Sequence, residues 1–202
     1  MTSTLLFIGD SITDAGRRTD PLRPLGEGYV SVLAQRLAAR GDDVRLLNTG
    51  ISGNRAVDLQ RRWNEDCLAL APSVLTIYVG INDVWRRYDS DDPTSAEDFE
   101  RTYRDLLEQA RGRLDARLIL ISPFVLPVEP GQEHWREDLD PKIAVVKRLA
   151  DEFSAELVDA DAAMTTAAAS LGAAALAADG VHPTPEGHEL LADEWLAVYD
   201  RA

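Results

Sequence analysis

Residues 5–11, Leu-Leu-Phe-Ile-Gly-Asp-Ser, join a short apolar run to a polar turn. A short apolar run bounded by a turn is typical of a buried strand, and Gly9 allows the backbone to turn directly behind it. Similar apolar runs follow along the chain at residues 44–47, 74–79, 118–121 and 157–158. Because strands that are buried on both faces read as unbroken apolar runs, the five segments predict a parallel sheet.

Segments with the length and the polar/apolar pattern of helices separate these runs. The expected helices cover residues 29–40, 56–70, 96–114, 139–153 and 185–199, with a shorter and looser helix in the alanine-rich segment 162–178. Regular alternation of strands and helices favours right-handed crossovers, which place helices on both faces of a sheet. The sequence therefore predicts an α/β protein, a three-layer α/β/α sandwich with a five-stranded parallel sheet, in which residues 1–202 form a single domain.

The amino-acid composition limits the kinds of partner that the protein can bind. The 202 residues carry a formal net charge of −14, which argues against nucleic acid or an anionic membrane as a partner and suits a neutral small-molecule substrate. No run approaches the ~20 apolar residues of a membrane span. Cys67 is the single cysteine of the sequence, which leaves no internal disulfide and no CxxC motif. Since residues 1–8 do not resemble a signal peptide, we expect a cytoplasmic protein.

The first polar turn carries a candidate nucleophile. Ligands of open α/β sheets bind beyond the carboxyl ends of the strands, and Ser11 stands just after the first predicted strand. At the start of a helical turn its backbone N–H points outward and could bind a developing oxyanion. An Asp-Ser turn that merely caps a helix would read the same way. This tripeptide alone therefore does not decide between catalysis and capping.

The loops after the second and third strands carry candidate oxyanion donors. Residues 48–55, Asn-Thr-Gly-Ile-Ser-Gly-Asn-Arg, are rich in glycine, and the Gly53 N–H could be one donor. Residues 80–85 read Gly-Ile-Asn-Asp-Val-Trp, and the side-chain amide of Asn82 could be another. Glycine-rich loops and Asn-Asp pairs also simply end strands, so each motif has a structural alternative.

A candidate catalytic base lies near the C-terminus. A histidine base needs a carboxylate that accepts a hydrogen bond from Nδ1 and stabilises the imidazolium. Asp179 and His182, three residues apart in Asp-Gly-Val-His-Pro, supply both groups. His134 and His188 are the alternatives, but neither has such a partner in sequence. We therefore expect His182 to be the base and Asp179 to orient it.

These blocks together resemble the SGNH (GDSL) hydrolases, whose signature residues correspond to Ser11, Gly53, Asn82 and His182. The resemblance covers residues 5 to about 200 and implies a flavodoxin-like fold and a serine esterase. It also implies a triad of Ser11, His182 and Asp179, oxyanion donors from Ser11, Gly53 and Asn82, and no metal or cofactor. A lysophospholipase or thioesterase of the same family is the alternative activity.

A closer similarity is to the intracellular acetylxylan esterases. It is carried by residues 7–14, 50–54, 58–59, 62–63 and 80–86. This resemblance implies removal of acetyl groups from short xylo-oligosaccharides, and relatives suggest a homo-oligomer. Ala178 departs from it, because those esterases carry an aromatic residue before the aspartate.

Three further residues are candidate substrate contacts. We expect Asp10, Trp85 and Trp135 to meet the sugar, although buried core tryptophans would fit the sequence equally well. A flavodoxin-like binding module without catalysis is the alternative from another class. It would need a phosphate cradle after the first strand, where residues 9–11 instead carry a carboxylate and no GxGxxG motif.

Overall fold

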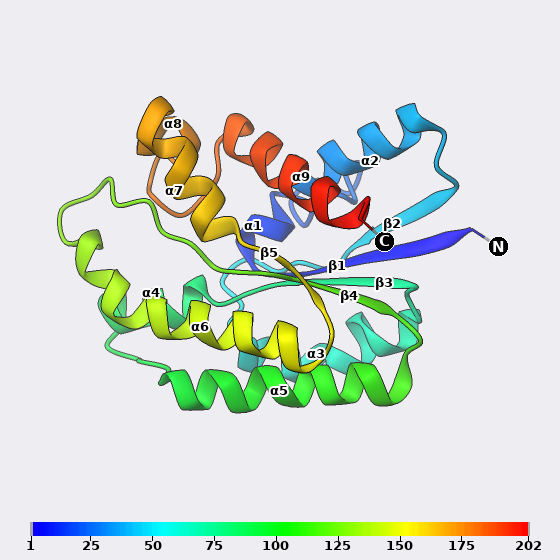
Figure 1. Cartoon of the computed structure of the whole chain (residues 1–202), viewed down its shortest axis with the longest axis horizontal. Coiled ribbons are helices and arrows are strands. Elements are labelled where there is room, and N and C mark those ends of the chain that lie inside the picture. The colour runs from blue at the N-terminus through cyan, green and yellow to red at the C-terminus, as the bar shows by residue number, and fades with distance from the viewer. Residues whose placement is uncertain (1, 202) are drawn as a thin grey trace.

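The computed structural model describes residues 2–201. In this part of the chain the strands form one parallel sheet in the order β2-β1-β3-β4-β5 (Figure 1). The strands are β1 (Ser3–Gly9), β2 (Val44–Asn48), β3 (Val74–Tyr78), β4 (Arg117–Ile121) and β5 (Glu156–Val158). This is the flavodoxin-like strand order, and the predicted α/β class and five-stranded parallel sheet are confirmed.

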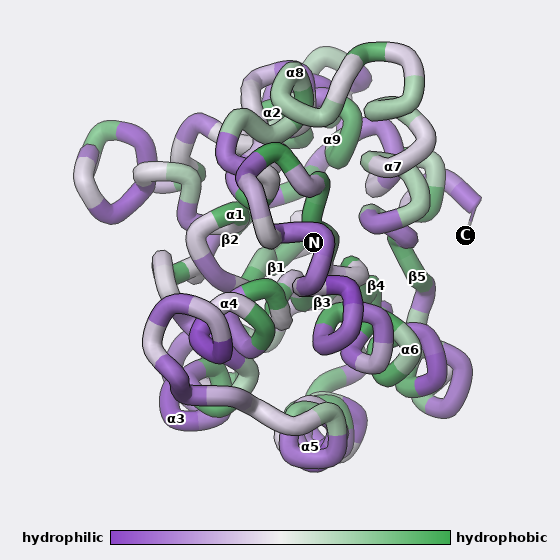
Figure 2. Tube along the Cα trace, turned by 90° about the vertical axis from the view of Figure 1, so that its left-hand side faces the viewer, coloured by the Kyte–Doolittle hydropathy of each residue, from purple (hydrophilic) through white to green (hydrophobic). Residues whose placement is uncertain are grey.

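Helices cover both faces of the sheet (Figures 1 and 2). One layer holds α1 (Ser11–Asp14), α2 (Tyr29–Arg40), α7 (Ala160–Leu171), α8 (Ala173–Leu176) and α9 (Pro185–Tyr199). The opposite layer holds α3 (Ala56–Asp66), α4 (Ile81–Asp89), α5 (Ala96–Arg113) and α6 (Arg136–Glu152). Two 3₁₀ segments, η1 (Leu68–Leu70) and η2 (Gln132–Trp135), complete the pattern. Among residues 2–201, no helix combines the length and the apolar character needed to cross a bilayer.

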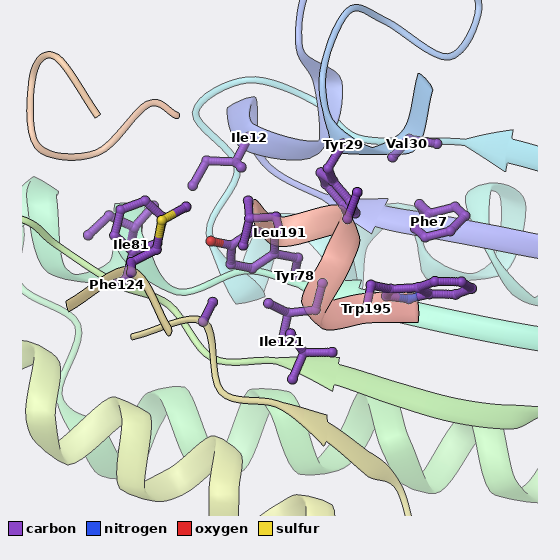
Figure 3. Close-up of a cluster of buried hydrophobic side chains, with 14 of the residues drawn as sticks. Phe7, Ile12, Tyr29, Val30, Tyr78, Ile81, Ile121, Phe124, Leu191 and Trp195 are labelled. Carbon is purple, nitrogen blue, oxygen red and sulfur yellow. The ribbon is translucent and has the colours of Figure 1, made fainter. Parts of the chain in front are cut away.

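Each face of the sheet has its own hydrophobic core. Alternate residues of β1 point to opposite faces, with Phe7 in one core and Ile8 in the other. In the first core the ring of Phe7 lies 5.3 Å from that of Trp195 on α9 and 5.8 Å from that of Tyr29 on α2 (Figure 3). Burying such a side chain stabilises the fold by roughly 1.5–3 kcal/mol. These contacts anchor α2 and α9 on the sheet.

The structure differs from the sequence-based expectations in where several helices begin, end or are interrupted. A helix that we did not predict, α4, begins directly after β3 and contains Asn82. The alanine-rich segment is broken at Gly172, which has a φ of +88° and separates α7 from α8. In contrast, α6 starts earlier than expected, at Arg136, and continues through Pro141. Proline has no backbone N–H, so Pro141 in the second turn leaves the Glu137 carbonyl oxygen without the hydrogen bond that a helix would otherwise provide.

The strand order places a switch point between β1 and β3. From β1 the chain crosses to β2 on one side, and β3 pairs with β1 on the other. In open α/β sheets this is where ligands bind, beyond the carboxyl ends of the strands. Because Gly9 pairs in register with Tyr78, the segments that carry Ser11 and Asn82 leave the sheet side by side.

Candidate active site

Ser11 is the first residue of the short helix α1, at the carboxyl end of β1. The turn before it requires a glycine, because a Cβ at residue 9 would lie 2.1 Å from the Tyr78 carbonyl oxygen. Asp10 is the N-cap residue, and its side chain accepts a hydrogen bond from the Ile12 N–H at 3.0 Å. The close approach of strands and the cap together fix the direction in which Ser11 leaves the sheet.

The structure brings Ser11, His182 and Asp179 into one hydrogen-bonded chain. Ser11 Oγ lies 2.9 Å from His182 Nε2, although 171 residues separate the two in sequence. His182 Nδ1 lies 2.6 Å from Asp179 Oδ2. These are the contacts that a hydroxyl nucleophile, a histidine base and an orienting carboxylate require.

Hydrogen bonds within its own loop keep the Asp179 carboxylate ionised. Its Oδ1 accepts hydrogen bonds from the N–H groups of Val181 at 2.9 Å and of His182 at 2.7 Å. Partial burial alone would raise the pKa of Asp179, but the hydrogen bonds from the His182 ring and from the two N–H groups lower this pKa below its usual value. The carboxylate therefore stays charged at neutral pH and accepts the proton of His182 Nδ1 as a hydrogen bond.

Gln132 supports this loop from the segment after β4. Its Nε2 donates to the Asp179 carbonyl oxygen at 2.7 Å, while its Oε1 accepts from the N–H groups of Val128 and Glu129 at 2.9 Å each. Gln132 is nearly buried, with 7% of its surface exposed. Gln132 could not be predicted from the sequence, since no motif marks a glutamine 47 residues from its partner.

The three candidate oxyanion donors lie on the loops and helices at the carboxyl ends of β1, β2 and β3. Gly53 has a φ of +82° and faces open space, as a glycine in a tight turn can. In the described chain, residues 2–201, the N–H groups of Gly53 and Ser11 donate to no protein group. Asn82 Nδ2 donates one hydrogen to the Asn54 carbonyl oxygen at 3.1 Å, which leaves its second hydrogen for a ligand.

Asp10 does not fit the predicted role of a substrate contact. Its side chain is 1% exposed, close to the equally buried Asp83, whose Oδ2 accepts from the Ala56 N–H at 3.1 Å. Burial, with a smaller contribution from Asp83, raises the pKa of Asp10 to about 7, and burial raises the pKa of Asp83 to about 7 as well. Asp10 instead caps the helix that carries the candidate nucleophile.

The two tryptophans lie together but differ in exposure. The ring centroid of Trp85, on α4, is 5.8 Å from that of His182 and 5.5 Å from that of Trp135. Trp85 is partly exposed, whereas Trp135 is 8% exposed and stacks on Tyr88 at 5.2 Å. Trp85 therefore remains a candidate substrate contact. Trp135 does not, because it is nearly buried and packs against the rings of Tyr88 and Trp85.

The other two histidines lie outside the hydrogen-bonded chain. His134 is largely exposed, and the carboxylate nearest its ring, that of Glu133, is 3.7 Å away. His188 is partly buried on α9, and its Nδ1 accepts a hydrogen bond from the Tyr29 N–H at 3.2 Å. Burial, aided by nearby His182, lowers the pKa of His188 to about 4, so this ring is neutral. Neither histidine contacts Ser11.

Comparison with known proteins assigns the chain to a family. Residues 7–190 match the model of the GDSL-like lipase/acylhydrolase family. The chain belongs to that family. As a member of the GDSL-like family, the protein is a hydrolase of carboxylic esters. The sequence-based resemblance to the SGNH (GDSL) hydrolases is thereby confirmed.

Relatives within the family include an acetylxylan esterase from Geobacillus stearothermophilus, which is 39% identical over 95% of this chain and 91% of that protein. A crystal structure of that esterase superposes with a TM-score of 0.88 at 38% identity, covering 96% of this chain and 93% of that one. Three further structures of it are described as catalytic mutants, with alanine replacing a serine, an aspartate or a histidine. A GDSL-like lipase from Parabacteroides merdae gives a TM-score of 0.93 at 31% identity, covering all of this chain and 97% of that one.

Proposed function

We propose that the protein removes acetyl groups from short xylose-based oligosaccharides, with Ser11 as nucleophile, His182 as general base and Asp179 as the orienting carboxylate. The observation that carries the catalytic part is the chain of contacts from Ser11 Oγ through the His182 ring to Asp179 Oδ2, at 2.9 and 2.6 Å. The related acetylxylan esterase also supports this assignment, because its replaced aspartate and histidine stand three positions apart, as Asp179 and His182 do.

The proposed reaction has two displacements. His182 Nε2 takes the proton of Ser11 as Oγ attacks the acetyl carbonyl, and the tetrahedral oxyanion is bound by the N–H groups of Ser11 and Gly53 and by Asn82 Nδ2. His182 then protonates the sugar oxygen as the ester C–O bond breaks. Water attacks the acetyl-enzyme, gives its proton to His182, and acetate leaves as Ser11 recovers its proton. Asp179 stabilises the imidazolium in both steps.

The surroundings of Ser11 favour a sugar ester over a long acyl chain. Trp85 presents a partly exposed aromatic ring beside His182, and such rings stack on the apolar faces of sugars. A hollow of about 730 Å³ runs along β2, but Ser11 does not line it, and its leucines share the lining with Arg17 and Arg45. A long acyl chain would need such a groove at the nucleophile.

A comparison of substrates tests the proposal. Acetate release from acetylated xylo-oligosaccharides is measured beside hydrolysis of a lysophospholipid and of an acyl-thioester, with wild type and Ser11→Ala. We expect wild type to prefer the acetylated sugar and Ser11→Ala to hydrolyse none of the three. A preference for the lysophospholipid or the thioester would overturn the substrate, and wild-type turnover by Ser11→Ala would overturn the catalytic assignment.

A further inference from the structure

We propose that Arg62 and Asp14 are positioning residues that clamp the oxyanion loop, residues 51–54, onto the nucleophile turn. This inference rests on the proposed function, because it assigns a reason for the placement of the Gly53 N–H. Neither residue contacts Ser11. Each instead fixes one of the two chain neighbours of Gly53 to the segment that carries the nucleophile.

Arg62 makes the first clamp from α3. Its Nε donates to the side chain of Asn54 at 2.8 Å, and its terminal nitrogens donate to the Thr49 carbonyl oxygen at 2.6 Å and the Gly9 carbonyl oxygen at 3.1 Å. A fourth contact, to the Asp66 carboxylate at 2.9 Å, fixes the guanidinium from the side of its own helix. One planar group thus joins the end of β1 to both ends of the loop after β2.

Asp14 makes the second clamp from the end of α1. Its Oδ2 accepts hydrogen bonds from the Ser52 N–H at 3.0 Å and the Ser52 hydroxyl at 3.1 Å. Asp14 is 4% exposed, so water competes little for these bonds. Since α1 begins with Ser11, this carboxylate ties the residue before Gly53 to the helix turn that holds the nucleophile.

The two clamps act on Gly53 from both sides. Gly53 itself has no side chain to anchor it and a Cβ there would meet nothing within 4 Å, so its N–H direction depends on Ser52 and Asn54. Asn54 has a second part in the arrangement, because its carbonyl oxygen accepts from Asn82 Nδ2 at 3.1 Å. Release of Asn54 would therefore loosen two of the three oxyanion donors together.

Arginine is the side chain that these contacts require. Arg62 has a 13% exposed side chain and donates in four directions within one plane. A lysine would keep the positive charge but offers three donors from a single nitrogen, which cannot reach Asn54, Thr49 and Gly9 together. Geometry, rather than charge, is therefore the property of Arg62 that the oxyanion loop uses.

The test compares Arg62→Gln and Arg62→Lys with Arg61→Gln, a matched control. Arg61 is the next residue on α3, has a 71% exposed side chain and pairs with Asp58 on the surface. Active sites are counted with a fluorophosphonate taken to complete labelling, and kcat and KM for an aryl acetate are then measured per labelled site. We expect Arg62→Gln to lower kcat about 10²-fold, with KM, the acid limb of the pH profile and the control unchanged. Arg62→Lys should lose almost as much.

A double variant separates positioning from general stability. Because Arg62 acts through the oxyanion donors, Arg62→Gln should cost far less in kcat when Asn82→Ala is already present. Full multiplication of the two losses, a shifted pH profile, or fewer labelled sites with kcat per site within threefold of wild type would overturn the proposal. If Arg62→Gln does not fold, the same outcomes are read from Arg62→Lys. Activity retained by Ser11→Ala would instead overturn the proposed function.

Discussion

Two aspartates near the candidate nucleophile, Asp10 and Asp179, lie in opposite environments. Asp179 lies on a surface loop with a 47% exposed side chain, and three hydrogen bonds hold its pKa below the usual value. Asp10 adjoins Ser11 in sequence, but it is 1% exposed and its pKa rises to about 7. The difference shows that local donors and burial, rather than nearness to Ser11 in sequence, decide which of the two carboxyl groups is ionised at neutral pH.

The largest expected effect in this comparison comes from Asp179→Asn. The amide cannot stabilise the imidazolium of His182 and favours the wrong ring tautomer, so kcat for an aryl acetate should fall about 10⁴-fold. The matched change, Asp10→Asn, leaves the contacts of His182 intact and should alter kcat at pH 8 less than tenfold. Similar losses in the two variants would contradict the assignment of separate roles.

The second largest effect is the change that Asp10→Asn makes in how stability depends on pH. The pKa of Asp10 is about 7 in the folded state, against 3.8 for an unperturbed aspartate, so the folded state holds this proton more tightly. Stability therefore falls as pH rises from about 4 through 7. Asp10→Asn lacks this loss, and its free energy of unfolding relative to wild type should rise by about 2 kcal/mol from pH 5 to 7. Urea unfolding at several pH values measures it, and parallel pH curves for the two proteins would rule out the buried neutral carboxyl.

His188 changes the free energy of unfolding with pH in the opposite direction from Asp10. His188 has a pKa of about 4 in the folded state, against 6.5 for an unperturbed histidine, so its stabilising contribution is present above pH 6.5 and is lost as the pH falls toward 4. His188→Asn should remove about 2 kcal/mol of the wild-type stability loss between pH 6.5 and 5. The variant should keep kcat at pH 8 within about threefold. A loss of turnover as large as that of His182→Asn would show that the His188 ring takes part in catalysis.

The smallest expected effect concerns Trp85. Aromatic contacts are worth about 0.5–1.5 kcal/mol, so Trp85→Ala should raise KM for acetylated xylo-oligosaccharides about 3–10-fold. An aryl acetate has no sugar to stack, and its KM should change less. Trp135→Phe, which keeps a ring behind Trp85, serves as the control. Equal changes for both substrates would remove Trp85 from the sugar site.

The order of the site residues along the chain was predictable because parallel strands end at one edge of the sheet. Ser11, Gly53 and Asn82 each follow a strand, and the structure brings their segments together there. The contact between Asp179 and His182 was predictable from their three-residue spacing within one tight turn. Local sequence patterns were therefore sufficient to predict most of the fold and the candidate triad.

Other features depend on contacts that no local pattern encodes. The burial of Asp10 arises from packing around β1, and Arg62 reaches the Gly9 carbonyl oxygen across 53 residues of sequence. Helix α4 was missed because Asn82 and Asp83, which are polar, point inward at its start. Their burial follows from the site that they build, so hydrophobic periodicity could not predict it.

The central claim is that Ser11 is the nucleophile. The most direct measurement is mass spectrometry of peptides from the wild-type protein after reaction with a fluorophosphonate. We predict one adduct per chain, on the peptide that contains Ser11, and loss of that adduct in Ser11→Ala. An adduct on another residue, or none while wild type still hydrolyses an aryl acetate, would contradict the account.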